Sequence, residues 1–196
     1  MAEPAGNPLR HDRAAKAAAV NLLWRLDPPE RTQLLPNVYC IVDAARDRQI
    51  YPALRGFAAD TRIASLYQGA TAQELAGVAP YLVSLGTGQR VFDWLWQEGW
   101  GNSWAIFFWS VLAFDGLRNH FRRLTIVETE ERERLVFRFY DPRVLSAFLP
   151  ICDGPQLGQM FGPVLHYVAE AEAGRTLRTF HLSGARLAID SSSLAG

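Results

Sequence analysis

Three charged residues stand among aromatic and aliphatic neighbours in segment 137–145, which reads FRFYDPRVL. Arg138, Asp141 and Arg143 could form a catalytic or ligand-binding cluster, because active sites hold charged groups in surroundings that shift their pKa values. A structural interpretation is favoured, however. Asp141 followed by Pro142 is a helix-start signal, since the carboxylate accepts from free backbone amides and proline fits the first helical position. Arg138 is close enough in sequence to pair with Asp141 and to brace a strand-to-helix junction.

Asp43 is the second candidate, at the end of a predicted strand in the run IVDAAR. Acidic residues at strand ends can be catalytic in α/β folds, because ligands gather there. They can also cap the following turn through a side-chain oxygen. No serine, histidine or second carboxylate lies at a telling distance in the sequence, so capping is favoured. The alternative is a small ligand-binding or enzymatic domain that uses Asp43, Arg138 and Asp141 in an open cleft.

Motifs for other chemistry are missing from the sequence, which has no P-loop, GxGxxG, HExxH or GxSxG pattern. The run SLGTGQR at 84–90 lacks the lysine and spacing of a phosphate loop and is interpreted as a turn. No pair of histidines has metal-ligand spacing. The four histidines are His11, His120, His166 and His181. We therefore expect neither a metal nor another cofactor.

Composition indicates a soluble protein with a real core, because 49% of the 196 residues are hydrophobic and 20% are charged. Lysine plus arginine equals aspartate plus glutamate, at 20 each, so there is no basic excess for nucleic acid. Cys40 and Cys152 lie far apart beside apolar residues and are expected to be buried free thiols. The most apolar run, 105–114, is shorter than the roughly 20 residues that span a bilayer. The N-terminus lacks the features of a signal peptide, so a cytoplasmic location is expected.

Hydrophobic periodicity predicts alternating helices and strands. Helices are expected at 12–26, 50–57, 71–80, 89–100, 113–124 and 142–150, and strands at 37–45, 62–67, 81–85 and 103–112. Two hairpins are expected, one from 125 to 140 with a charged tip at Glu130–Arg134, and one from 164 to 182 around Gly174. Thr71 and Glu74 suggest a capping box at the start of their helix.

The fold class follows as α/β or α+β: a single compact mixed-sheet domain with packed helices and an N-terminal helix. Residues 1–36 are assigned to an N-terminal arm and helix, with a loose arm at 1–10. Residues 37–165 form the main domain, and 166–196 form a C-terminal hairpin and a frayed tail from 191. Strand alternation before the junction is expected to place Phe137 and Phe139 on one face, and Arg138 and Tyr140 on the other.

Several pieces, taken in order, resemble one family. They are YCIVDAA (39–45), SLYQG (65–69), VAPYLVSL (78–85), FDWLWQEGWGNSWAIFFWS (92–110), LRNHFRRL (117–124), FRFYDPRVL (137–145) and MFGPV (160–164). This order resembles the type VI secretion system effector adaptor-chaperone family, called Tap or TEC, first catalogued as a domain of unknown function. The residues that carry the resemblance are expected to be mainly structural. They are Asp43, Tyr67, Pro80, Tyr81, Leu82, Trp100, Gly101, Arg122, Arg138, Tyr140, Asp141, Pro142, Arg143, Phe161, Gly162 and Pro163.

The resemblance implies a bacterial protein that binds a toxic effector in the cytoplasm and helps load it onto the trimeric VgrG spike, sometimes with a PAAR-containing partner. Such proteins are not enzymes, and the resemblance implies no cofactor, nucleic acid or membrane partner. Three exposed features are candidate binding surfaces: the turn at Trp100, the hairpin tip at Glu130–Arg134, and the N-terminal helix. An immunity or regulatory partner protein is a further alternative, suggested by small size and neutral charge.

Overall fold

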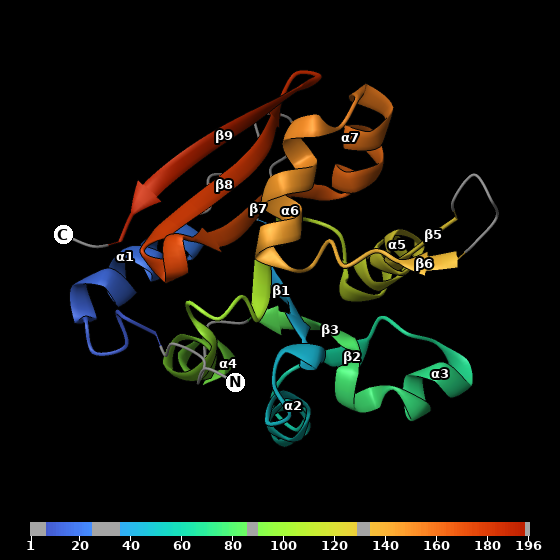
Figure 1. The fold of residues 1–196 in the computed structure, drawn as a ribbon, viewed down its shortest axis with the longest axis horizontal. Helices are drawn as coiled ribbons and strands as arrows, with labels where there is room; N and C mark the ends of the chain where they lie inside the picture. Colours follow the sequence, from blue (N-terminus) through green and yellow to red (C-terminus); the bar gives the residue numbers. More distant parts are fainter. Residues whose placement is uncertain (1–6, 25–35, 86–89, 129–133, 195–196) are drawn as a thin grey trace.

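A seven-stranded antiparallel sheet organises the chain (Figure 1). The computed structural model describes residues 7–24, 36–85, 90–128 and 134–194. The strand order across the sheet is β2-β3-β1-β4-β7-β8-β9. The strands are β1 (Asn37–Asp43), β2 (Ile63–Ser65), β3 (Pro80–Leu85), β4 (Ala105–Ser110), β7 (Val164–Ala171), β8 (Thr176–Ser183) and β9 (Arg186–Ser193). The predicted fold class is confirmed, and the antiparallel pairing selects α+β.

Both faces of the central strands are covered, which explains their continuous apolar sequences. In β1, Cys40 and Val42 point to one core while Tyr39 and Ile41 point to the other. The first face is covered by α1 (Arg13–Trp24), α2 (Ile50–Phe57) and α4 (Arg90–Trp94), which continues into a π-helical turn at Leu95–Gly99. The second face is covered by α5 (Phe114–Thr125), α6 (Pro142–Phe148) and α7 (Gly154–Phe161).

Shorter elements fill the connections. A two-stranded ribbon of β5 (Ile126–Glu128) and β6 (Arg134–Val136) stands beside the main sheet (Figure 1). The others are η1 (Ala44–Arg46), α3 (Gly69–Glu74), η2 (Ala76–Val78), η4 (Leu149–Ile151) and η5 (Glu172–Gly174). Residues 86–89, which make up most of the predicted 84–90 turn, lie outside the described residues. Within the described residues, every helix is too short or too polar to cross a membrane.

The predicted cap at Thr71 is wrong. The helix begins at Gly69, so Thr71 lies inside it, and the cap position is Gln68, whose side chain makes no capping hydrogen bond. The helix also ends early, at Glu74, and a separate 3-10 turn follows at Ala76–Val78 before β3. A capping-box pattern identifies residues able to cap, but the helix starts three residues earlier than a cap at Thr71 requires.

The expected strand alternation up to Tyr140 is also wrong. Strand β6 ends at Val136, and the chain then turns, with the Asp141 amide donating to the Arg138 carbonyl at 3.0 Å. Phe139 and Tyr140 are consecutive and both buried, which a strand with one covered face does not allow.

The described residues nearest to the two chain ends are held more firmly than expected. In the expected loose arm, Asn7 donates through Nδ2 to the Trp96 carbonyl at 2.7 Å, and Leu9 is buried. Residues 1–6 lie outside the described part of the chain. The expected frayed tail from 191 is wrong through 194, because β9 pairs with β8 as far as Ser193 and Leu194 is buried. Strand β7 joins β4 to β8, so residues 166–193 extend the same sheet as β1.

Trp100 is buried, which corrects its place among the exposed candidate surfaces. Its ring packs on Trp96 at a centroid distance of 4.8 Å, and its Nε1 donates to the Gly174 carbonyl at 2.9 Å. The turn between Gly99 and Gly101 forms as predicted, and Gly101 has a φ of 84°. The partner Gly174, also at φ 84°, lies so close that a Cβ there would come within 2.6 Å of the Trp100 ring.

Gly174→Ala should therefore lower the free energy of unfolding by about 2–4 kcal/mol, through a left-handed backbone and overpacking against Trp100. Urea unfolding followed by tryptophan fluorescence measures this. Gly184→Ala is the matched control, because Gly184 also has a positive φ but has open space around its Cβ position. The control should lose only about 1 kcal/mol. Equal losses at the two sites would contradict the packing argument.

Candidate functional site

Asp43 lies at the end of β1, fully buried, at the centre of a polar cluster. Its Oδ1 accepts from the Ala45 amide at 3.1 Å, so the predicted capping role is confirmed. Its Oδ2 accepts from the Arg138 guanidinium, which is 95 residues away in sequence. The predicted pairing of Arg138 with Asp141 is therefore wrong. A buried carboxylate without a charged partner is costly, and Arg138 is the partner that the fold brings to the end of β1.

Asp141 caps α6 as predicted, with Pro142 at the first helical position. Its Oδ1 accepts from the Arg143 amide at 2.9 Å and from Arg143 Nε at 3.0 Å, and its Oδ2 accepts from Arg143 Nη2 at 2.6 Å. Burial alone would raise the pKa of Asp141. The hydrogen bonds from Arg143 and the positive charges of Arg143 and Arg46 outweigh burial, so the pKa lies below its ordinary value.

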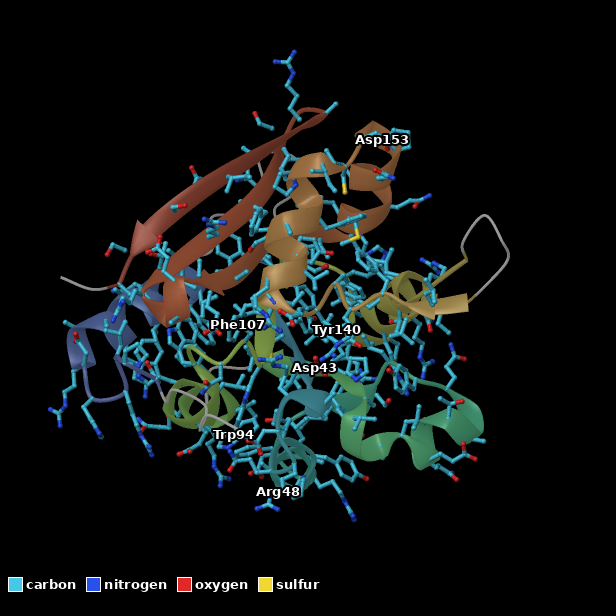
Figure 2. All side chains as sticks on the ribbon, viewed as in Figure 1. Asp43, Arg48, Trp94, Phe107, Tyr140 and Asp153 are labelled. Atoms are coloured by element: carbon cyan, nitrogen blue, oxygen red, sulfur yellow. The ribbon has the colours of Figure 1, made fainter. Side chains whose placement is uncertain are left out.

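Tyr140 links the Asp43 side of the cluster to Tyr67 in the neighbouring loop. Figure 2 shows Tyr140 beside Asp43, where the chain enters α6. Burial raises the pKa of Tyr140 well above its ordinary value, with a smaller contribution from the neighbouring Tyr67 phenol. The Tyr67 carbonyl accepts from Arg122 at 3.4 Å, which ties α5 to the same cluster. Seven of the residues that carry the family resemblance thus meet at one end of the sheet: Asp43, Tyr67, Arg122, Arg138, Tyr140, Asp141 and Arg143.

An open cleft of about 440 Å³ lies next to this cluster. Its lining residues are Arg46, Gly101, Asn102, Ser103, Arg143, Glu170, Ala171, Glu172, Ala173 and Gly174. Asp43, Arg138 and Asp141 are not among them, and both carboxylates are buried. The constellation expected for the enzymatic alternative therefore does not converge on this cleft.

Glu170 is a buried residue that lines the cleft, and the sequence analysis missed it. Its side chain is buried, its Oε2 accepts from the Gly101 amide at 2.6 Å, and its Oε1 accepts from the Ser103 amide at 2.5 Å. Burial raises the pKa of Glu170 to about 7, against the lowering effect of the two amides and of Arg46. Strand alternation could have predicted the burial of Glu170, because Glu170 lies on the same face of β7 as the core residue Val168.

Backbone strain concentrates at the same cleft. The three non-glycine residues with positive φ in the described ranges are Ser103, Glu172 and Ala173, at 58°, 52° and 54°, and all three line the cleft. Such conformations cost about 1–3 kcal/mol each and persist only where the surroundings hold them. Here Glu170 holds the 101–103 turn, and the Trp100 indole holds the η5 turn.

The remaining resemblance residues have structural contacts. In β3, Leu82 is buried, and the Tyr81 hydroxyl donates to the Ala76 carbonyl at 2.8 Å. The Pro80 carbonyl accepts from the Leu66 amide at 2.9 Å. After the buried Phe161, Gly162 turns with a φ of 42° against the His120 ring, and the Pro163 carbonyl accepts from the Ser110 hydroxyl at 2.7 Å. No three His, Cys, Asp or Glu side chains in the described ranges are placed to hold a metal ion.

Asp43→Ala should lower the free energy of unfolding by about 1–3 kcal/mol, because the variant loses a cap and a charged hydrogen bond. Chemical unfolding monitored by circular dichroism measures the change. Asp47→Ala is a matched control, since Asp47 caps an exposed amide at Gln49 and forms no salt bridge with an arginine among the described residues. Its loss should stay below about 1 kcal/mol. An Asp43 variant as stable as the control would show that the Arg138 pair contributes nothing.

Glu170→Gln should change how stability depends on pH. The pKa of Glu170 is raised from 4.5 to about 7 in the fold, so the folded state binds more protons than the unfolded state between these values. The Glu170 contribution to the free energy of unfolding therefore falls as pH rises from about 4.5 to about 7, by roughly 3 kcal/mol in total.

The measurement is the difference in unfolding free energy between wild type and variant, from pH 8 down to pH 5. The difference should shift in favour of the wild type as pH falls. Burial lowers the pKa of His166 to about 4, and this group titrates in the opposite sense, but it is present in both proteins and cancels. A difference that stays constant with pH would contradict the raised pKa of Glu170.

Comparison with known proteins places this site within a family. A family model described as "Domain of unknown function (DUF4123)" matches residues 38–159. Neither the curated proteins nor the solved structures gave a match. The matched range contains the Asp43 cluster, helices α5 and α6, and most of α7. Because the model covers more than half of the 196 residues, the chain belongs to the DUF4123 family.

Proposed function

We propose that this protein is a cytoplasmic adaptor-chaperone that binds a type VI secretion effector and helps load it onto the VgrG spike, in some cases with a PAAR-containing protein. The observation that carries the proposal is the ordered set of motifs from residue 38 to 164. That range nearly coincides with the DUF4123 match at 38–159. The proposed role is binding and release, so it needs no catalytic residue.

The polar cluster supports a scaffold role. Asp43 and Asp141 each place both carboxylate oxygens in hydrogen bonds within the chain, to backbone amides and to one arginine each. Groups bonded in this way fix the positions of η1 and α6. A general acid or base instead needs access to a substrate proton.

The β5–β6 ribbon is the surface that we assign to the effector. Ile126, Leu135 and Val136 are exposed by 46%, 49% and 53%. Ile126 and Val136 are directly opposite one another, and the ribbon projects from the body of the domain (Figure 1). Leu135 lies on the opposite face of the ribbon from this pair. Adjacent exposed apolar groups such as Ile126 and Val136 are candidate protein-binding sites. The proposed partner is therefore an apolar segment of the effector, which the ribbon covers until the effector reaches the spike.

The other candidate surfaces fit less well. Most of the predicted hairpin tip, Glu130–Arg134, lies outside the described residues, although the ribbon leads to it. Trp100 is buried. The N-terminal helix α1 is placed as predicted, but it packs Ala15, Ala19 and Leu23 into the first core and exposes mainly alanine and polar side chains.

Ile126→Asp and Val136→Asp should each weaken binding of the effector by about tenfold or more, because a charge replaces a desolvated contact. The test is co-purification of the tagged protein with any toxin and VgrG that the neighbouring genes encode. Val78→Asp is the matched control, since Val78 is 46% exposed but lies on η2, away from the ribbon.

The outcomes separate the parts of the proposal. If the wild-type protein recovers neither a toxin nor a VgrG, the proposed adaptor function is wrong. Binding that survives both ribbon substitutions would reject the ribbon but not the function. Deletion of the gene should abolish secretion of one effector without killing the producing strain. Self-intoxication after deletion would instead support an immunity protein.

A further inference from the structure

Strand β9 forms one edge of the main sheet and is unusually open. It pairs with β8 over eight consecutive residues without a bulge, and it is the last strand in the order of the sheet. Figure 1 shows no described element along its outer side. The opposite edge, β2, has only three residues. Natural proteins keep edge strands short or blocked, because an open edge is a template for another strand.

The outward-facing backbone groups of β9 follow from its pairing. The Leu194 amide donates to the Arg175 carbonyl at 2.8 Å, so residues 175 and 194 form a hydrogen-bonded pair. In an antiparallel ladder such pairs alternate along the strand. Residues 186, 188, 190 and 192 therefore bond to β8. The amides and carbonyls of Leu187, Ile189 and Ser191 point away from the sheet.

We propose that β9 pairs antiparallel with β9 of a second copy of this chain, in the register that sets Arg186 opposite Asp190. A two-fold axis then passes between the two copies of Ala188. Arg186 faces Asp190 twice on one face of the sheet, and Leu187 faces Ile189 twice on the other. Arg186 and Ile189 are exposed in the single chain, and the Asp190 side chain is 71% exposed.

The charges distinguish this register from its neighbours. Shifting the two strands by one residue sets outward backbone groups against inward ones, so the ladder cannot form. A shift by two places Asp190 opposite Ala188 and Arg186 opposite Ser192, which loses both ion pairs. A shift by four places Asp190 directly opposite Asp190, and like charges in that position repel.

Arg186 and Asp190 also disfavour an unrelated partner strand. Such a strand would need a negative group opposite Arg186 and a positive group opposite Asp190. A second copy brings them by symmetry. This complementarity is the reason for choosing a second copy of the chain over another protein as the occupant of the edge. The inference does not depend on the proposed adaptor function.

The test is sedimentation equilibrium of the full chain and two charge-reversal variants. The wild type should form a dimer that dissociates on dilution, because one added strand pair is a small interface. Arg186→Asp and Asp190→Arg should each weaken the dimer by about tenfold or more, since each sets two like-charged pairs in contact.

An equimolar mixture of the two variants should restore dimerisation to near the wild-type level. In the mixed dimer, the new carboxylate faces the new guanidinium, and native Asp190 faces native Arg186. Arg48→Asp makes the same change of charge at an exposed site that Figure 2 labels far from β9, and it should not alter the dimer. Circular dichroism and the Tm confirm that each variant is folded.

Amide hydrogen exchange reports the register independently. Raising the protein concentration should slow exchange at Leu187 and Ile189 but not at Ser191, which has no partner strand opposite it in this register. A wild type that stays monomeric up to about 1 mM would overturn the proposal. So would a mixture that fails to restore the dimer, or slowed exchange at Ser191.

Discussion

A buried carboxylate at the end of the central strand is the constraint that organises this fold. Asp43 ends β1, which is covered on both faces, so the side chain reaches no water. An ionised carboxylate in such a place needs both hydrogen bonds and a counter-charge. The turn of η1 supplies the first through the Ala45 amide, and Arg138 supplies the second. The position of Arg138 in turn fixes where the chain can begin α6, and α6 covers the second core.

Three buried carboxylates at one end of the sheet are stabilised in the same way. Strands β1 and β7 are parallel to each other, with β4 between them, so Asp43 and Glu170 lie at the same end. Asp141 stands nearby at the start of α6. Each carboxylate accepts from at least one backbone amide of a turn, and each lies near an arginine. The acids thus hold irregular backbone in place where the regular ladder of the sheet ends. The strained residues beside Glu170 are a consequence of that arrangement.

Sequence reasoning succeeded where the determining contacts are local. Most of the helices, the strands β1, β2, β3, β4, β7 and β8, and the Asp141–Pro142 cap follow from periodicity and from neighbours within a few residues, but α7 and β9 were not predicted. The partner of Arg138 could not be found in this way, because Asp43 is 95 residues distant and a nearer carboxylate was available. Glu170 was missed for the same reason, since its partners at 101 and 103 are 69 and 67 residues away. Trp100 was taken for a surface residue because its turn suggests exposure. Its burial depends on Gly174, which the sheet brings from 74 residues along the chain.

The two proposed binding surfaces lie at opposite ends of the domain, with the β5–β6 ribbon at one end and β9 at the other (Figure 1). Pairing through β9 therefore leaves both ribbons free, so a dimer could hold two effector segments. Under the proposed adaptor function, a two-fold dimer must deliver its cargo to a three-fold VgrG spike, and the two symmetries do not match. A weak edge-to-edge contact resolves this conflict, because it can hold the unloaded protein as a dimer and release single chains on engagement. A large hydrophobic dimer interface would instead resist that release.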